Sequence, residues 1–437
     1  KAPIMMRQLE ATIEKKAFQE GIQEYIKTYA NGNADWNELI SILDKKTSID
    51  MKAWSEVWVN QSGRPIITDS IDYASNRTIS NFTVTQKAED ETDKIWTQQF
   101  EIGLVYPDST HVINVSMLNK NVVVENTIGL LKPLSVVYNY NGFGYGVFPI
   151  QNENLDAFLS LEDEVARGYA FINLYEQTLN NNVAPIKAFQ LFKQAILEEQ
   201  EEVLVRLISG KLQSIFWTYL TKEERDKVVG NLETDVKQRL EGRETSGIKK
   251  SLFGLYKSIA YSSKGQEFLY SIWNKTINIQ NLKLNTDDYT SLASTLALYN
   301  HPDTQNILET AETQITNPDK LERFQFLLPS LSNDEAVRDT LFESFADAKN
   351  RAKESWVLNA LGNIHHPLRQ ESGQKHLKQS LELLEEIQLT GDIFFPKRWL
   401  SSSIGRYNSA YAKNVLETFL SENPNFSPIL KNKLLQA

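Results

Sequence analysis

Apolar side chains at the start of the chain recur three or four residues apart, which is the spacing of one face of a helix. Over 4–29 this pattern predicts a helix in two pieces, with Gly21 as its weak point. A second helix is predicted over 35–43, capped by Asp35, and a third over 49–58, where two tryptophans four residues apart share a face. The chain therefore begins with a small helical segment.

After Gly63-Arg64-Pro65 the spacing of apolar residues changes from helical to alternating. Short alternating runs follow up to residue 150, with turn-forming segments such as Pro107-Asp108-Ser109 between them. This pattern predicts a small β-sandwich. The apolar members of the runs are Phe82, Val84, Phe100, Ile102, Leu104, Ile113, Val115, Met117, Val122, Val124, Leu134, Val136 and Tyr138.

Helical spacing returns after the alternating region and persists to the end of the chain. Short amphipathic stretches are separated by helix-breaking pairs such as Asn317-Pro318. No clean repeat signature is present, but successive short helices are typical of an α-superhelix of stacked pairs, as in HEAT and armadillo proteins. We therefore predict a multidomain, mainly α-helical chain with one β-sandwich, divided into 1–64, 65–150 and 151–437.

Composition narrows the classes of function. The 437 residues include 41% hydrophobic and 23% charged side chains, which are the proportions of a folded globular chain. Lys plus Arg number 46 against 56 Asp plus Glu, a formal net charge of -10, and no basic stripe is present, so nucleic-acid binding is disfavoured. The lack of cysteine excludes disulfides, thiolate catalysis and sulfur-ligated zinc. No apolar run is long enough for a transmembrane segment, and both extracytoplasmic and cytoplasmic locations fit.

A search for catalytic and metal-binding motifs finds none. The five histidines form neither H-E-x-x-H nor H-x-x-E-H, and no G-x-S-x-G is present. Gly142, Gly144 and Gly146 lie between alternating segments without a P-loop lysine, so a turn is predicted there. His365 and His366 follow a predicted helix, where helix capping or solvation is expected. Tryptophans at helical positions are expected to pack in the core.

Several short motifs follow one another in an informative order. They are Lys1-Ala2-Pro3-Ile4-Met5-Met6 with Leu9-Glu10; Phe18, Gly21, Tyr25 and Tyr29; Trp54, Trp58, Gly63 and Pro65; Asn141-Gly142-Phe143-Gly144-Tyr145; and Leu161–Tyr175 with Arg167-Gly168 and Ile172-Asn173. This order resembles the C-terminal half of the zinc metallo-aminopeptidases of the aminopeptidase N type, a gluzincin family, over essentially the whole chain. Ala2 departs from the usual Gly, and Gly146-Val147 from a common aromatic residue or Arg.

The resemblance implies a zinc-dependent hydrolase that removes N-terminal amino acids from peptides. In that family H-E-x-x-H and a downstream Glu hold zinc, the Glu of the motif is the general base, G-x-M-E-N holds the substrate amine, and a Tyr stabilises the oxyanion. None of these motifs occurs in this sequence, and the family's Tyr would fall two positions before Lys1. Because the chain also opens without Met, it is interpreted as cut from a longer protein just past the catalytic residues and inactive alone.

The resemblance also assigns roles to the predicted parts. Residues 1–64 would be the helical C-terminal part of a thermolysin-like catalytic domain, and the superhelix would cap the active-site chamber and restrict substrate access. The implied partners are the catalytic domain of the same polypeptide and peptide substrates; zinc belongs to the parent and none to this chain.

Two arginines are candidate substrate contacts within this picture. Arg398 and Arg406 are candidates for the peptide C-terminus because Arg binds carboxylates bidentately, and ordinary inter-helix pairing is the alternative. The alternative function for the whole chain is a non-catalytic, protein-binding scaffold built of the β-sandwich and the superhelix.

Overall fold

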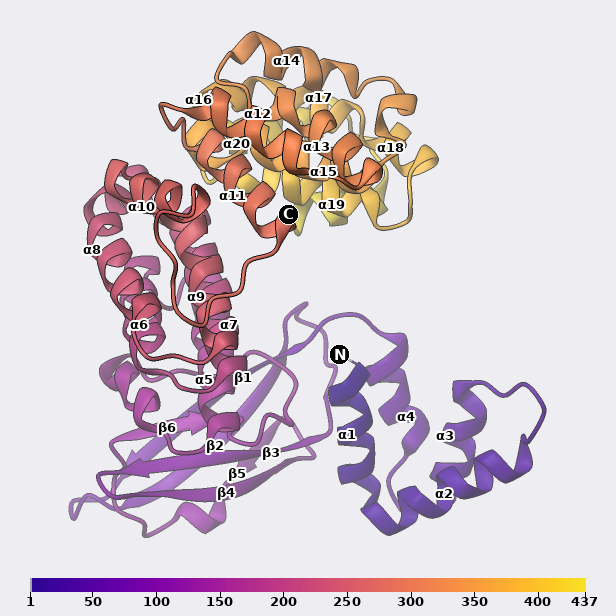
Figure 1. The fold of residues 1–437 in the computed structure, drawn as a ribbon. Coiled ribbons are helices and arrows are strands. Elements are labelled where there is room, and N and C mark those ends of the chain that lie inside the picture. Colours follow the sequence, from indigo (N-terminus) through magenta and orange to yellow (C-terminus); the bar gives the residue numbers. More distant parts are fainter. Residues whose placement is uncertain (1) are drawn as a thin grey trace. The chain divides into compact units, whose positions relative to one another are not determined.

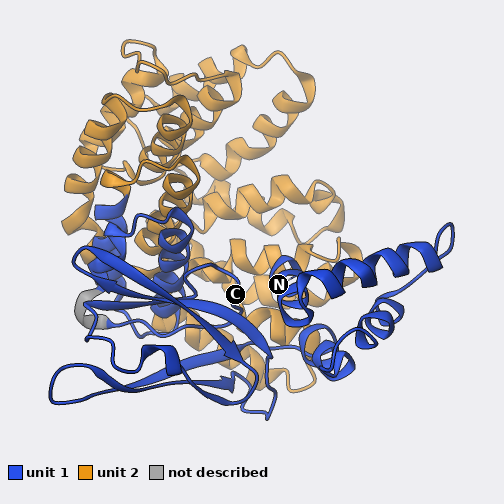
Figure 2. Ribbon diagram, turned by 90° about the horizontal axis from the view of Figure 1, so that it is seen from below, with its two compact units in different colours: residues 1–195 blue, residues 196–437 orange. Residues whose placement is uncertain are grey.

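The computed structural model describes residues 2–437, so Lys1 of the first motif lies outside the described residues. The chain divides into two units, 1–195 and 196–437, which Figure 2 distinguishes by colour. Most of the described backbone is helical, and the strands belong to two small antiparallel sheets (Figure 1). The expected mainly helical class with a β component is confirmed, while the three-part division at residues 64 and 150 stays a prediction.

The helices of the first unit begin at the N-terminus and resume after the sheets. Asp35 caps α3 as predicted: its carboxylate accepts backbone N–H groups, and Glu38 reciprocates at the Asp35 N–H. Trp54 and Trp58 stack with ring centres 5.3 Å apart, as their spacing predicts. The helices that begin in this unit are α1 (Ala2–Ile13), α2 (Lys15–Thr28), α3 (Trp36–Asp44), α4 (Met51–Ser55), α5 (Glu164–Leu179) and α6 (Pro185–Glu198), of which the last ends beyond residue 195. A π-helical turn lies at Glu56–Asn60, and 3-10 segments lie at Glu125–Thr127 and Asn152–Ser160.

The break in the first helical region lies at Glu14 and not at Gly21. Glu14 has φ 67° and separates α1 from α2. Gly21 lies inside α2, where an added Cβ would come within 2.3 Å of the Leu43 side chain. The expectation of a weak point at Gly21 is therefore wrong, because this glycine allows α2 to approach α3 closely.

The described strands form two three-stranded antiparallel sheets, with strand orders β1-β2-β5 and β4-β3-β6. In the second sheet Ile102 of β3 lies opposite Ile113 of β4 and Tyr138 of β6, so alternate residues gather on one face. Apolar side chains of both sheets, including Phe82 and Phe100, belong to one buried core. The strands are β1 (Pro65–Tyr73), β2 (Ile79–Ala88), β3 (Gln98–Tyr106), β4 (Ser109–Met117), β5 (Asn121–Val123) and β6 (Ser135–Tyr138).

Strand β1 is the element that the alternating pattern missed. Its stretch Thr68–Asp72 is mostly polar and partly exposed along its length, so it carries a weak alternation. By contrast, the predicted turn after β6 is confirmed, with Gly142 at φ 70° and Gly146 at φ 144°. A Cβ at Gly146 would come within 2.6 Å of the Pro65 carbonyl oxygen, so glycine is required where this turn meets β1.

The second unit consists of short helices in succession. Asn317 caps α13, with Pro318 in its first turn, so this predicted break is a helix start. A buried core around Phe342 and Trp399 holds the last helices together. The helices are α7 (Glu202–Ser214), α8 (Lys222–Glu241), α9 (Ser246–Ile259), α10 (Ser263–Trp273), α11 (Thr286–Leu298), α12 (Thr304–Gln314), α13 (Pro318–Leu331), α14 (Glu335–Ser344), α15 (Glu354–Ile364), α16 (Gln370–Gly373), α17 (Leu377–Glu382), α18 (Leu384–Thr390), α19 (Phe395–Ser402), α20 (Ala410–Glu422) and α21 (Pro428–Leu435). Shorter turns are π-helical at Ile215–Tyr219 and 3-10 at Ala348–Arg351, Pro367–Arg369, Gln374–His376 and Ile404–Arg406.

Candidate functional site

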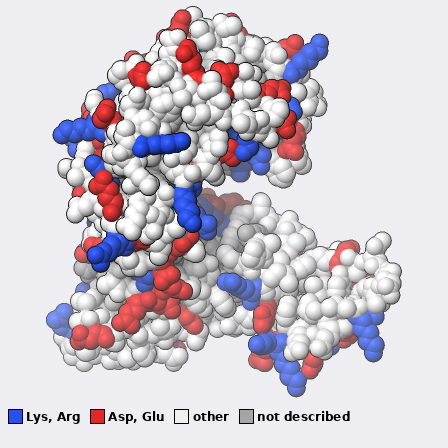
Figure 3. Space-filling view, viewed as in Figure 1, with Lys and Arg blue, Asp and Glu red and all other residues white. Residues whose placement is uncertain are grey.

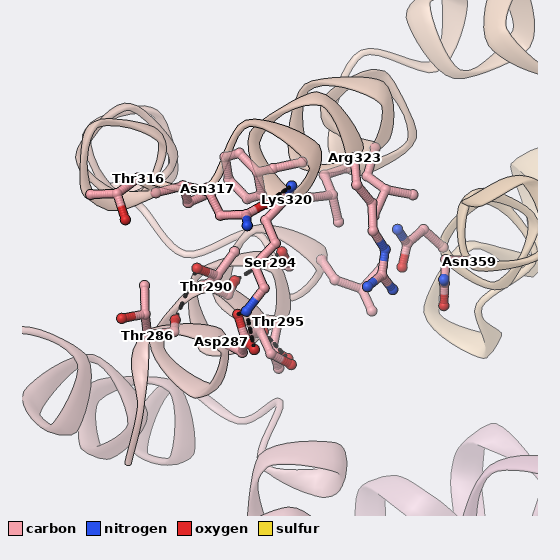
Figure 4. Close-up of a pocket in the computed structure, with 17 residues that line it drawn as sticks. Thr286, Asp287, Thr290, Ser294, Thr295, Thr316, Asn317, Lys320, Arg323 and Asn359 are labelled. Atoms are coloured by element: carbon pink, nitrogen blue, oxygen red, sulfur yellow. Dashed lines mark hydrogen bonds and ion pairs between the residues drawn. The ribbon is translucent and has the colours of Figure 1, made fainter. Parts of the chain in front are cut away.

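Two adjoining cavities lie within the second unit. One, of about 480 Å³, lies between α11, α13 and α15 (Figure 4). The other, of about 380 Å³, extends from these helices toward α9 and the turns at 215–219 and 404–406. Both are lined by Thr295, Leu298, Asn359 and Asn363. Because they share these residues, we treat them as one helical groove, with Lys320 at one end and Arg406 at the other.

One wall of the helical groove is a row of hydroxyl groups on α11. Thr286, Thr290 and Ser294 recur every four residues along this wall. The hydroxyls of Thr290 and Ser294 each donate a hydrogen bond, at 3.0 Å, to the backbone carbonyl four residues earlier. Since each hydroxyl has one proton and two lone pairs, these groups face the groove as hydrogen-bond acceptors.

The facing wall carries two asparagines on α15. The Asn359 amide nitrogen donates to the Ser355 carbonyl at 2.7 Å, and that of Asn363 donates to the Ser330 hydroxyl at 2.9 Å. Their carbonyl oxygens make no hydrogen bond within the described part of the chain, and both residues line the groove. Both walls of the cavity therefore carry uncharged oxygen acceptors, and each asparagine amide keeps a second N–H donor.

Cationic side chains outnumber carboxylates in the helical groove. Lys320 forms an ion pair with Asp287 at 2.7 Å, which neutralises both. Arg323, exposed on α13, reaches toward the wall that carries Asn359 (Figure 4) and has no ion-pair partner among the described residues. Lys257 and Arg406 line the second cavity, where no Asp or Glu contributes to the lining. The groove therefore has a positive balance in a chain whose net charge is -10.

Of the two cations that line the second cavity, Arg406 has the fewer hydrogen-bond partners for its charged group. Its Nε is buried and has no hydrogen-bond partner among the described residues. Burial lowers the pKa of its guanidinium, which still stays charged near neutral pH. Lys257 is partly satisfied, because its ammonium donates to the Ser291 hydroxyl at 2.6 Å, and burial lowers its pKa as well. A carboxylate in this cavity would compensate Arg406 directly.

The two predicted arginines do not share a cavity. Arg398 is exposed on α19, and its guanidinium lies 5.9 Å from the centre of the Phe394 ring. It lines neither cavity of the helical groove. Arg406 lies at the end of the 3-10 turn Ile404–Arg406 and lines the second cavity. The structure thus brings Arg406, and not Arg398, next to the acceptor walls.

His366 closes the second cavity as a neutral ring. It packs against Trp217 with ring centres 4.6 Å apart, and its Nδ1 accepts the Leu368 N–H at 3.2 Å. Burial, helped by the charge of Arg406, lowers the pKa of His366 to about 3. The proton of the neutral ring therefore resides on Nε2, which is a donor. His366 thus caps the turn Pro367–Arg369 that follows it, as a neutral acceptor, and not the end of the preceding helix, where the expected cap would lie. A solvated His365 is also wrong, because that side chain is fully buried beside Tyr407.

The remaining histidines have separate surroundings. His111 is exposed on β4, as expected of a polar strand residue, Nδ1 of His301 accepts the Asp303 N–H at 3.1 Å, and His376 lies 2.8 Å from Asp339. Among the side chains that the structure describes, no cluster of three or more His, Asp or Glu is placed to hold a metal ion. The donor sets of the described residues therefore do not fit a zinc centre.

A further cavity, of about 160 Å³, lies in the first unit beside the Gly-rich turn. Its cation, Arg64, pairs with Glu176 at 2.7 Å and with Glu89 at 3.2 Å. Two carboxylates thus satisfy the one guanidinium. This cavity has no unpaired charge to offer, so the helical groove is the better candidate site.

The surface charge is mixed. On the face drawn in Figure 3, Lys and Arg are interspersed with Asp and Glu and do not gather into one basic patch. No helix of the described residues combines the length and the apolar character that a membrane crossing requires.

Comparison with known proteins gives partial matches. No protein-family model matches the chain. Aminopeptidase N of Streptomyces lividans is 30% identical over 88 residues, 20% of this chain and 10% of that protein. Tricorn protease-interacting factor F2 of Thermoplasma volcanium is 22% identical over 222 residues, 49% of this chain and 26% of that protein. Glutamyl aminopeptidase of Bos taurus is 28% identical over 88 residues, 20% of this chain and 9% of that protein.

A solved structure extends the likeness to nearly the whole chain. The crystal structure of Legionella pneumophila aminopeptidase A in complex with aspartic acid is similar with a TM-score of 0.58 and 12% identity, over 96% of this chain and 56% of that one. The chain resembles part of an aminopeptidase of the aminopeptidase N type. This is the family that its motifs predict. The sequence matches cover between 9% and 26% of the curated relatives, so the activity of a whole protein is a matter for proposal.

Sequence reasoning found one end of this aminopeptidase-like chain's groove and missed its walls. Arg406 was a candidate because of its charge, but Thr290, Ser294, Asn359 and Asn363 were not. Their signal is a spacing of four between small polar residues within helices, which places them on one face. Trp217 was expected in the core; it is buried, but it also forms part of the cavity wall.

Proposed function

We propose that this chain is the C-terminal portion of a zinc-dependent aminopeptidase that removes N-terminal amino acids from peptides. The observation that carries the proposal is the ordered set of motifs, supported by partial matches to three proteins named as aminopeptidases or as a protease-interacting factor. The fold likeness to an aminopeptidase over 96% of the chain is consistent with it. In such an enzyme zinc polarises the scissile carbonyl and activates a water molecule.

In this proposal the chain supports catalysis without supplying the zinc ligands. Residues 1–64 complete a thermolysin-like catalytic domain, residues 65–150 form the β-sandwich, and residues 151–437 form a superhelix that caps the active-site chamber. The zinc, its ligands, the general base and the oxyanion-stabilising Tyr belong to the parent outside this chain. The chain alone is then inactive.

We further propose that Arg406 contacts the C-terminal carboxylate of a peptide, with Arg398 as a second, more exposed cation. The support for Arg406 is its unpartnered Nε beside a cavity whose lining lacks carboxylates. A bidentate contact would satisfy the guanidinium and select peptides by their free carboxyl end. Arg398 is available from its exposed position on α19.

The test is hydrolysis of a panel of aminoacyl-p-nitroanilides by the full-length parent, with and without a zinc chelator, beside this chain alone. We expect chelator-sensitive cleavage by the parent and none by the chain. A folded parent that cleaves no substrate of the panel would favour the alternative, a non-catalytic scaffold that binds a protein partner.

A further inference from the structure

We propose that the helical groove binds the backbone of an extended peptide, with hydrogen bonds from successive residues to alternate walls, and so holds peptides independently of their side chains. This inference rests on the proposed function only in taking peptides as the ligand class. It concerns the row of hydroxyls on α11 and the two asparagines on α15, to which the family resemblance assigns no role.

The first step is the match of two repeats. Thr286, Thr290 and Ser294 are four residues apart on α11, which corresponds to about 6 Å along a helix axis. Asn359 and Asn363 repeat the same spacing on the facing wall. An extended chain advances about 6.6–6.8 Å every two residues, so its alternate residues stay close to such a row over two or three steps.

The second step is the chemistry of the two rows. The hydroxyl protons of Thr290 and Ser294 are held by their own helix, and the amide groups of Asn359 and Asn363 each donate to a neighbour. What remains toward the groove is a set of acceptors, together with the second N–H of each asparagine amide. Backbone N–H groups of an extended chain point alternately to its two sides, so odd and even residues of one peptide would donate to opposite walls.

The third step is the charge at the groove. Arg323 and Arg406 are without ion-pair partners among the described residues, and Lys257 adds a further positive charge. A peptide with a free carboxyl end supplies an anion for Arg406, whose buried Nε has no hydrogen-bond partner among the described residues. A neutral oligosaccharide has hydroxyl donors for the acceptor rows but no anion for the cations. The combination therefore favours a peptide.

The experiment measures the binding of a fluorescein-labelled ten-residue Ala/Ser peptide with a free C-terminus to the 437-residue chain by fluorescence anisotropy. The groove variant is Thr290→Val/Ser294→Ala, which removes two of the three hydroxyl acceptors in the α11 row. The matched control is Thr340→Val on α14, an exposed threonine whose hydroxyl makes the same bond to the carbonyl four residues earlier, at 2.8 Å, outside the groove. Circular dichroism and urea unfolding establish that each variant is folded.

We expect the groove variant to bind roughly five- to tenfold more weakly, from the loss of two hydrogen bonds, and the control to bind as the unmodified chain does. Two further peptides, one N-methylated at its odd positions and one at its even positions, distinguish hydrogen bonds to α11 from hydrogen bonds to α15. With one of them the α11 substitutions should have no further effect, because the N–H groups facing α11 are gone. With the other the full effect should persist. Reordering the side chains should change the affinity less than twofold.

Several outcomes would overturn the inference. Peptide binding that is insensitive to both the α11 substitutions and the N-methylation pattern would show that the peptide binds elsewhere. No binding at millimolar peptide would show that the chain does not hold peptides. Equally tight, substitution-sensitive binding of maltohexaose would identify a carbohydrate site instead. The proposed function is judged separately by the nitroanilide assay. If the parent is inactive but the alternating pattern is found, the enzyme proposal fails and the peptide groove stands.

Discussion

The interior of the first unit, where α1 packs on β3, and the helical groove of the second use polar side chains in opposite ways. Gln8 in α1 is fully buried and makes three hydrogen bonds to backbone groups, of which two go to Gln99 and one to Phe143. In the groove, Thr290 and Asn359 each make one bond to their own helix and keep an acceptor free. A saturated polar group stabilises the fold, whereas an open one is available to a ligand.

The largest effect is expected from truncating the core that the two sheets share. Phe100 is 1% exposed and packs edge-to-face on Phe148, with ring centres 5.1 Å apart. We expect Phe100→Ala to lower the free energy of unfolding by about 4 kcal/mol, from lost burial and the cavity left behind. Urea unfolding measures this. The exposed Val112→Ala on β4 is the control and should change stability by less than about 0.5 kcal/mol.

A smaller loss is expected when the buried polar bridge is removed. Gln8→Leu keeps the volume but leaves the Gln99 N–H and carbonyl and the Phe143 carbonyl without their partner. Unsatisfied buried groups cost about 1–3 kcal/mol each, and partial access to water reduces the sum, so we expect a loss of about 3 kcal/mol. Gln23→Leu, on the exposed side of α2, is the matched control. Equal stability of the two variants would show that the Gln8 bridge is dispensable.

The contrast between Asp35 and Gln8 explains how much of the fold could be predicted. Asp35 acts on residues two and three positions away, so its cap is written in the local sequence. The partners of Gln8 lie 91 and 135 residues further along the chain, and no local pattern brings them together. Alternation likewise revealed the strand of Phe82, whose one face is buried, but not the polar stretch Thr68–Asp72 of β1.

The candidate site shows the same limit. Arg406 is predictable as a candidate because a guanidinium can bind a carboxylate bidentately. Its neighbours Lys257, Thr295 and Asn359 come from three other helices and carry no motif. Their common location is a product of helix packing, so a single sequence does not reveal it.

A change of pH tests whether His366, which lines the groove, is neutral in the folded chain. Burial, together with nearby arginine charges, lowers the pKa of His366 from its ordinary value of 6.5 to about 3. Between these values the unfolded chain binds a proton that the folded chain excludes. Stability from this group is therefore full above pH 6.5 and is lost as the pH falls.

For one such histidine, lowering the pH from 7 to 5 costs about 2 kcal/mol of the free energy of unfolding. We expect His366→Asn, whose side-chain oxygen can still accept the Leu368 N–H, to reduce the pH-dependent loss by that amount. Urea unfolding at the two pH values measures the difference. The same loss in the variant and the unmodified chain would mean that His366 is protonated in the folded state.

The smallest effect on stability is expected in the acceptor row itself. Thr290 is half-buried on α11, and Val has the same shape and nearly the same helix propensity. Thr290→Val removes the hydroxyl and with it the hydrogen bond to the Thr286 carbonyl. That carbonyl can then accept a hydrogen bond from water. We expect a change of less than about 0.5 kcal/mol in the free energy of unfolding. A loss of 2 kcal/mol or more, on the order expected for a buried unsatisfied group, would make Thr290 a structural residue like Gln8. The comparison between the saturated core and the open groove would then fail at the residue on which it most depends.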